Sequence, residues 1–174
     1  LLYYYLLLTS NDKILISSIF IFKLFEKEVK TMNQLKDAIE KAKENENKLI
    51  LIVGLPGSGK SKLIHEYSKD SGIPILDLDN IFKDTTNNIA EVMDNFLVTY
   101  NKDVLLLDNK KILYAKDSNI DMLSFLKNLA EKLIVVATWN GKVDNNKLIH
   151  IRSKLPTDLT YSLDNEQLTI IQKS

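Results

Sequence analysis

The sequence predicts an α/β domain in three layers, with a mainly parallel sheet of about five strands, helices on both faces and a C-terminal hairpin. Short apolar runs suited to buried strands alternate with amphipathic segments of helical periodicity. A glycine-rich segment lies between the first strand and the helix that follows it. Strands that alternate with helices favour a parallel sheet, because each helix carries the chain back along one face.

Composition limits the functions that the chain can have. Its 174 residues suit one domain with a substantial core. The 23 basic and 23 acidic residues balance, so no global field attracts nucleic acid or an anionic membrane. Arg152 is the only arginine, so only one guanidinium group is a candidate for contacting a phosphate in a transition state. The absence of cysteine excludes disulfides, thiolate zinc sites and thiol nucleophiles, and it fits a cytoplasmic protein.

Residues 1–31 are predicted to be an apolar extension, as upstream sequence or an accessory tail, before a domain over residues 32–174. The apolar runs Leu1–Leu8 and Ile14–Phe25 are both shorter than the roughly 18–20 residues of a membrane-spanning helix. The extension also lacks the basic start and the cleavage site of a signal peptide. A packing helix is predicted from Met32 to about Glu46. We therefore expect no stable membrane insertion, with a weak membrane anchor as the alternative.

The segment 49–61 predicts a buried strand, a glycine loop and the start of a helix. Its residues 54–61, GLPGSGKS, fit G-x-x-x-x-G-K-[ST], the Walker A motif or phosphate-binding loop of P-loop NTPases. Backbone N–H groups and the helix N-terminus surround phosphates in this motif. Lys60 is expected to neutralise the β and γ phosphates of ATP, and Ser61 to bind Mg²⁺. The predicted ATP-binding residues are Gly54, Leu55, Pro56, Gly57, Ser58, Gly59, Lys60, Ser61 and Lys62.

A second strand is predicted over Ile73–Asp79, and Pro74 at its beginning favours a sheet edge. Asp77 and Asp79 have two interpretations. In small-molecule kinases, a carboxylate at this position can bind substrate or activate its hydroxyl group, whereas simple alternation of polar and apolar residues is the plainer reading. His65, on the helix after the loop, is interpreted as a surface or packing histidine.

A third strand, residues 103–108, ends in a carboxylate and follows a helical stripe that runs from Ile89 to Tyr100. After a phosphate loop, such a strand is typical of a Walker B motif, so Asp108 is expected to hold Mg²⁺ directly or through water. Asn109 follows where many ATPases carry a glutamate that polarises the attacking water. An amide cannot act as a general base, so hydrolysis by the isolated protein is expected to be slow.

A helix over residues 122–130 and a fourth buried strand over 133–138 complete the predicted parallel part. Thr138 and Asn140 fall where related ATPases place a residue that senses the γ-phosphate or positions water. Trp139, between them, is interpreted as a core or partner-packing residue. The predicted catalytic residues are Lys60, Asp108, Asn109, Thr138 and Asn140, and the predicted metal ligands are Ser61 and Asp108.

Two further strands are predicted near the C-terminus. The residues Asp144, Asn145 and Asn146 favour a turn before a strand over 147–151, which predicts a hairpin. A last strand is predicted over 168–171.

From Met32 to the C-terminus, the chain resembles BrxF, the small P-loop proteins of type 3 BREX phage-defence systems. The resemblance is carried by LILIVGLPGSGKS at 49–61, by LDN at 107–109 with the ILYAKD stretch after it, and by ATWNG at 137–141. It implies a cytoplasmic ATP-binding component of an antiviral complex, with other BREX proteins as partners and any DNA contact made through them. Relatives often carry a glutamate two residues beyond the asparagine, where this chain has Lys111. If that glutamate activates water, this protein is expected to bind ATP without efficient turnover.

Two other functions stay open. A small-molecule kinase would use Asp77 or Asp79, but an arginine-rich lid is missing from the sequence. A structural module with a vestigial nucleotide site is the other alternative. Strand order, base preference and oligomeric state do not follow from the sequence.

Overall fold

The computed structural model describes residues 10–82, 89–108, 110–114, 120–151 and 158–174, with side chains from residue 18 onward in these ranges except those of Lys111 and Tyr114. In chain order, the elements are α2 (Ser10–Glu44), β1 (Leu49–Gly54), α3 (Lys60–Ser71), β2 (Ile75–Asp77), α4 (Leu78–Ile81), α5 (Ile89–Thr99), β3 (Val104–Asp108), η1 (Lys111–Tyr114), α6 (Met122–Ala130), β4 (Ile134–Asp144), β5 (Lys147–His150), β6 (Leu159–Ser162) and β7 (Thr169–Gln172).

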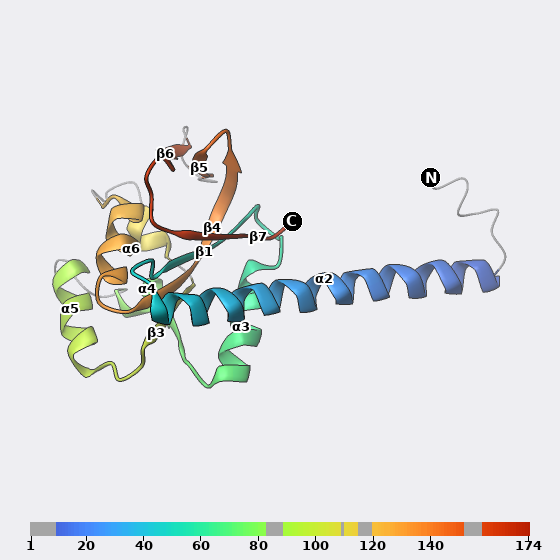
Figure 1. Ribbon diagram of the computed structural model, residues 1–174, viewed down its shortest axis with the longest axis horizontal. Coiled ribbons are helices and arrows are strands. Elements are labelled where there is room, and N and C mark those ends of the chain that lie inside the picture. Colours follow the sequence, from blue (N-terminus) through green and yellow to red (C-terminus); the bar gives the residue numbers. More distant parts are fainter. Residues whose placement is uncertain (1–9, 83–88, 109, 115–119, 152–157) are drawn as a thin grey trace.

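The sheet is mainly parallel, as the alternating sequence pattern predicts. Its parallel strands lie in the order β2-β3-β4-β1-β7, so β1 is an inner strand and β2 is at an edge, in agreement with Pro74 (Figure 1). The long strand β4 continues past the parallel part and pairs with β5 in an antiparallel hairpin. Asn145 and Asn146 have φ angles of 46° and 58°, which suit the tight turn that the sequence predicts there. The strand β6, which the sequence did not predict, pairs with β5.

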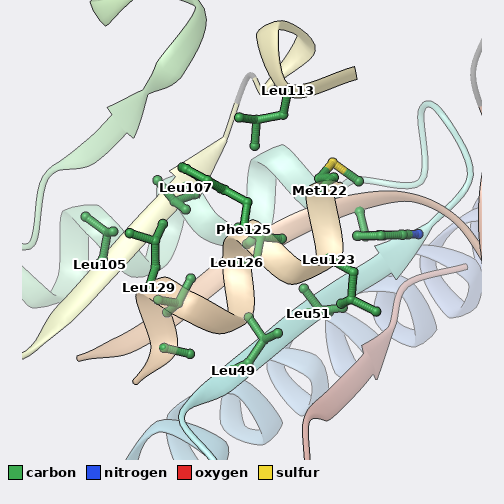
Figure 2. Close-up of a cluster of buried hydrophobic side chains, with 14 of the residues drawn as sticks. Leu49, Leu51, Leu105, Leu107, Leu113, Met122, Leu123, Phe125, Leu126 and Leu129 are labelled. Carbon is green, nitrogen blue, oxygen red and sulfur yellow. The ribbon is translucent and has the colours of Figure 1, made fainter. Parts of the chain in front are cut away.

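Helices cover both faces of the sheet, and alternate residues of β1 show why. Leu49 and Leu51 face a cluster that includes α6, whereas Ile50 and Ile52 face the cluster that includes α2 and α3. Figure 2 shows Phe125 and neighbouring apolar residues of α6 above the strands. All four of these β1 side chains are at most 1% exposed, which accounts for the unbroken apolar run in the sequence.

The first helix begins at Ser10, far before the predicted start at Met32. The first proline or glycine in the chain is Gly54, so these two helix-breaking residue types do not interrupt this segment. The C-terminal half of α2 packs on the sheet through Leu35, Ile39 and Ala42. Its N-terminal half extends beyond the sheet (Figure 1), with Phe25 63% exposed. Within the described residues, we find no helix with both the length and the hydrophobicity for crossing a membrane.

Two strands differ in length from the prediction. The second strand stops at Asp77, because the Asp77 carboxylate accepts a hydrogen bond of 3.1 Å from the Asn80 N–H and caps α4. The fourth strand continues past Thr138 to Asp144, because its second half pairs with β5 in the hairpin that the sequence predicts. Thr138 and Asn140 therefore lie inside β4 rather than at the end of a strand.

Candidate phosphate-binding site

The glycine loop connects the end of β1 with the start of α3. Gly57 and Gly59 have φ angles of 83° and 86°, a left-handed conformation that side chains with a Cβ rarely adopt. The Ser58 N–H donates to the Leu55 carbonyl at 3.1 Å and closes a turn inside the loop. Two of the predicted glycines are therefore required by backbone conformation.

Gly54 is required by close packing instead. A Cβ at this position would overlap the Lys173 carbonyl oxygen and the Ser58 hydroxyl. The chain after β7 lies here because the Lys173 N–H donates to the Val53 carbonyl at 2.7 Å. The beginning of the loop is thus held between its own turn and the C-terminal strand.

Lys60, the first residue of α3, folds back over the loop. Its ammonium donates to the Leu55 carbonyl at 2.7 Å and to Ser58 Oγ at 3.4 Å, and the residue is only 5% exposed. Burial lowers the pKa of Lys60, and the nearby Asp108 carboxylate opposes this shift. An ammonium in this position can bind an anion on the loop.

Asp108 ends β3 and lies beside Thr138 of the neighbouring strand β4. The Thr138 hydroxyl donates to Asp108 Oδ1 at 2.7 Å, while Oδ2 lies 3.8 Å from His65 Nε2. Both Asp108 and Thr138 are buried, whereas the His65 side chain is 65% exposed. The sequence interpretation of His65 as a surface histidine therefore omitted its closeness to Asp108.

Lys110 is a site residue that the sequence reasoning missed. Its ammonium is buried and donates two hydrogen bonds to Thr138, one to the carbonyl oxygen at 2.5 Å and one to Oγ1 at 3.1 Å. Burial lowers the pKa of Lys110 to about 8 and Lys60 adds to this effect, although the carboxylates of Asp108 and Asp79 oppose it. In the sequence, a lysine after a strand looks like an ordinary solvated residue, so only its two-residue distance from Asp108 could have indicated this role.

These groups surround a cavity of about 400 Å³, within the usual size range of small-molecule sites. Its walls contain the predicted residues Pro56, Gly57, Gly59, Lys60, Ser61, Asp108, Thr138 and Asn140. Three further residues, Lys110, Met122 and His150, complete the lining. The predicted residues outside the lining are Gly54, Leu55, Ser58 and Lys62, and Asn109 lies outside the described residues.

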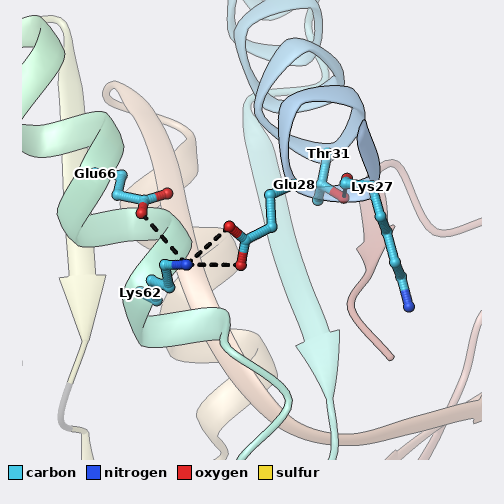
Figure 3. Close-up of polar contacts among 5 residues, drawn as sticks. All are labelled: Lys27, Glu28, Thr31, Lys62 and Glu66. Carbon is cyan, nitrogen blue, oxygen red and sulfur yellow. Dashed lines mark hydrogen bonds and ion pairs between the residues drawn. The ribbon is translucent and has the colours of Figure 1, made fainter. Parts of the chain in front are cut away.

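Lys62 does not reach the cavity, because its side chain is held by the first helix. The ammonium donates to both carboxylate oxygens of Glu28 on α2, at 2.7 and 2.8 Å, and lies 3.8 Å from Glu66. Figure 3 shows this ammonium between the two carboxylates. Lys27, one residue before Glu28, donates to the Ser174 hydroxyl at 2.9 Å. The first helix therefore contacts both α3 and the C-terminal strand.

His150 lines the cavity where the hairpin meets the parallel sheet, and Trp139 packs behind it. Trp139 is fully buried and its indole N–H donates to the Ile149 carbonyl at 3.1 Å, so its predicted core role is confirmed. The His150 ring packs edge-on against it, with ring centroids 5.1 Å apart. Sequence reasoning missed His150, because its place in the cavity depends on the pairing of β5 with β4.

The two carboxylates of the kinase alternative take structural roles. Asp77 caps α4, and Asp79 Oδ1 accepts a hydrogen bond of 2.8 Å from the Ile112 N–H. Neither residue lines the cavity beside the glycine loop.

A larger hollow of about 460 Å³ lies at the opposite ends of the strands. Its lining includes Lys48 before β1, Asp103 before β3 and Ile134 at the start of β4. In open α/β sheets, ligands bind beyond the carboxyl ends of the strands. The cavity at the glycine loop has that position, and it also contains the buried charged groups.

The cavity has the donors and ligands for a metal-bound phosphate chain. Lys60, Lys110 and the N-terminus of α3 would face phosphate oxygens, and Ser61 with Asp108 could hold Mg²⁺. Within the described part of the chain, no three acidic or histidine side chains gather into a metal site. Comparison of the chain with known protein families, curated proteins and solved structures finds no match.

Proposed function

We propose that this chain is a P-loop NTPase that binds Mg²⁺-ATP at the glycine loop. One observation carries the proposal: a single cavity is lined by Gly57 and Gly59 in left-handed conformation, by Lys60 and Ser61 at the start of a helix, and by the buried Asp108. This is the arrangement in which backbone N–H groups and a lysine bind phosphates while a hydroxyl and a carboxylate bind the metal.

The proposed protein is a weak or partner-dependent ATPase. Asp108 is the only carboxylate among the residues that line the cavity in the described chain, and it is assigned to the metal. Asn140 lines the same cavity and can orient a water molecule, but its amide is no general base. The His150 imidazole also lines the cavity but packs against Trp139, and we assign it no role as a base. On this assignment, efficient hydrolysis needs a group from a partner protein.

The biological setting rests on the resemblance to BrxF. We place the chain in a cytoplasmic BREX-type phage-defence complex, with other BREX proteins as partners and DNA contacts made through them. The kinase alternative is weakened because Asp77 and Asp79 are bound within the fold. The vestigial-module alternative differs from our proposal only in its lack of nucleotide binding.

Calorimetric titration with Mg²⁺-ATP tests the binding site. We expect saturable binding by the full chain and a loss of at least about tenfold in affinity for Lys60→Ala, since charge-assisted contacts to phosphate are removed. Lys69→Ala, an exposed lysine later on the same helix, is the matched control. Absence of binding would support the vestigial module, and equal affinity of Lys60→Ala would contradict the assigned site.

Single-turnover hydrolysis tests the dependence on partners. The purified chain alone is expected to hydrolyse ATP more slowly than ~1 s⁻¹, the lower end of typical enzymes. Purified BREX proteins are expected to raise this rate. A faster rate without them would overturn the partner-dependent ATPase, and transfer of phosphate to a small molecule would support a kinase.

A further inference from the structure

Lys110 is a buried cation in the wall of the same cavity, although it belongs to neither the glycine loop nor the strand that ends in Asp108. It is 6% exposed, and its ammonium donates to the carbonyl and the hydroxyl of Thr138. An ammonium has three N–H donors, and Thr138 accounts for two of them. A buried charge costs folding free energy, so its place beside a cavity calls for an explanation.

The charges that line the cavity favour a polyanion. Lys60 and Lys110 contribute two positive charges, and Asp108, the one carboxylate among the lining residues, contributes one negative charge. Binding of Mg²⁺ at Asp108 would leave both ammonium groups without a negative partner on the cavity wall. A phosphate chain would relieve the repulsion between the two lysines.

The two lysines approach the cavity from different sides. Lys60 belongs to the loop and helix, where backbone N–H groups bind the inner phosphates and the lysine reaches the β and γ phosphates from the loop side, whereas Lys110 follows Asp108 and is tied to Thr138 on β4. A metal held by Ser61 and Asp108 would draw the terminal phosphate oxygens to the Asp108 side of the cavity, where Lys110 lies. We propose that Lys110 donates a hydrogen bond to the γ-phosphate of a bound nucleoside triphosphate, so that the site distinguishes a triphosphate from a diphosphate.

Thr138 is the positioning residue for this contact. Its Oγ1 accepts a hydrogen bond from Lys110 and donates one to Asp108, so one hydroxyl orients both the cation and the metal ligand. The carbonyl of the same residue holds Lys110 as well, but it belongs to the backbone of β4 and side-chain replacement leaves it in place. The inference rests on the proposed function, because it names the phosphate that Lys110 contacts.

Calorimetric titration of the full chain with Mg²⁺-ADP and with a non-hydrolysable Mg²⁺-ATP analogue tests the proposal. The wild type is expected to bind the analogue at least about tenfold more tightly than ADP, the usual effect of a hydrogen bond to a charged group. Lys110→Met should lower this ratio to about threefold or less and leave the ADP affinity within about threefold of wild type. Lys69→Met is the control, and Lys110→Gln is the second variant if Lys110→Met does not fold.

Thr138 variants test positioning. Thr138→Ser keeps the hydroxyl and should keep the triphosphate preference, whereas Thr138→Val should reduce it. The inference would be overturned by a wild-type ratio below about threefold, or by an unchanged ratio in a folded Lys110→Met or Lys110→Gln variant. Neither result would contradict the proposed function. The proposed function fails separately, if the wild type binds neither nucleotide or Lys60→Ala binds both as well as the wild type does.

Discussion

The Thr138 hydroxyl donates a 2.7 Å hydrogen bond to Oδ1 of Asp108, and it links the carboxyl end of β3 to the middle of the neighbouring strand β4. Neither residue is adjacent to the other in sequence, and both are buried. A hydrogen bond of this kind orients a carboxylate that serves as a metal ligand. The proposed Mg²⁺ site therefore depends on β4 as well as on the two segments that carry the sequence motifs.

Replacement of Asp108 by asparagine should remove the magnesium dependence of nucleotide binding. The amide keeps the size of the side chain and can accept the Thr138 hydrogen bond, but it lacks the charge that holds the metal. The gain in ATP affinity on adding Mg²⁺ is expected to be about tenfold smaller in Asp108→Asn than in the wild type. Titrations with Mg²⁺ and with EDTA measure the difference. Asp103→Asn, an exposed residue directly before the same strand, is the control, and an equal response to Mg²⁺ in both variants would exclude Asp108 as a ligand.

Replacement of Lys110 by methionine should stabilise the protein near pH 7. Burial lowers the folded-state pKa of Lys110 to about 8, below its ordinary value of 10.5, so the charged form is disfavoured in the fold. Removing that cost is expected to raise the free energy of unfolding by about 1–3 kcal/mol, after the lost hydrogen bonds to Thr138 are included. Urea denaturation at pH 7 measures this gain.

The same variant should reveal the sign of the pH dependence. Between pH 8 and 10.5 the unfolded wild type binds more protons at Lys110 than the folded state does, so the stability of the wild type rises with pH relative to Lys110→Met. The gain from the substitution is therefore expected to be smaller at pH 9.5 than at pH 7. A gain that does not change with pH would show that Lys110 is not buried as a cation.

A methyl group at Gly54 should disturb both folding and binding. The added Cβ would overlap the Lys173 carbonyl and the Ser58 hydroxyl, and overpacking of this kind costs about 1–3 kcal/mol. Gly72→Ala is the control, because Gly72 has a φ of 69° but open space around it. We expect a larger fall in melting temperature for Gly54→Ala, with weaker ATP binding only in that variant. Equal effects would mean that the loop tolerates displacement from the C-terminal strand.

A chain that begins at Met32 should keep its fold and its ATP affinity. The truncation cuts α2 and removes the Glu28 contact to Lys62, but Leu35 and Ile39 still pack on the sheet. An exposed ion pair contributes little to stability, so the melting temperature of the truncated chain is expected to stay close to that of the full chain. Circular dichroism and ATP titration measure the outcome. An insoluble or nonbinding product would make residues 10–31 part of the folded domain.

Local geometry was readable from the sequence, because it depends on neighbouring residues. The apolar run of β1 predicts a buried strand. The glycines of the loop and the Asn145-Asn146 turn predict left-handed backbone conformations, which few other residues adopt so readily. The carboxylate at the end of β3 could be predicted in the same way, since a strand direction implies the edge at which its last residue lies. The sequence also predicted helices for both faces, from the periodicity of their apolar residues.

Only the tertiary structure determines which strands lie next to each other and which of their side chains meet. Nothing near Lys110 in sequence indicates that it is buried. Its burial follows from the position of β4 between β1 and β3, because β4 brings Thr138 against Asp108 and Lys110. His150 reaches the cavity for the same reason, through the pairing of β5 with an extended β4. Strand order depends on how whole faces pack against helices distant in the chain, and short sequence patterns do not encode it.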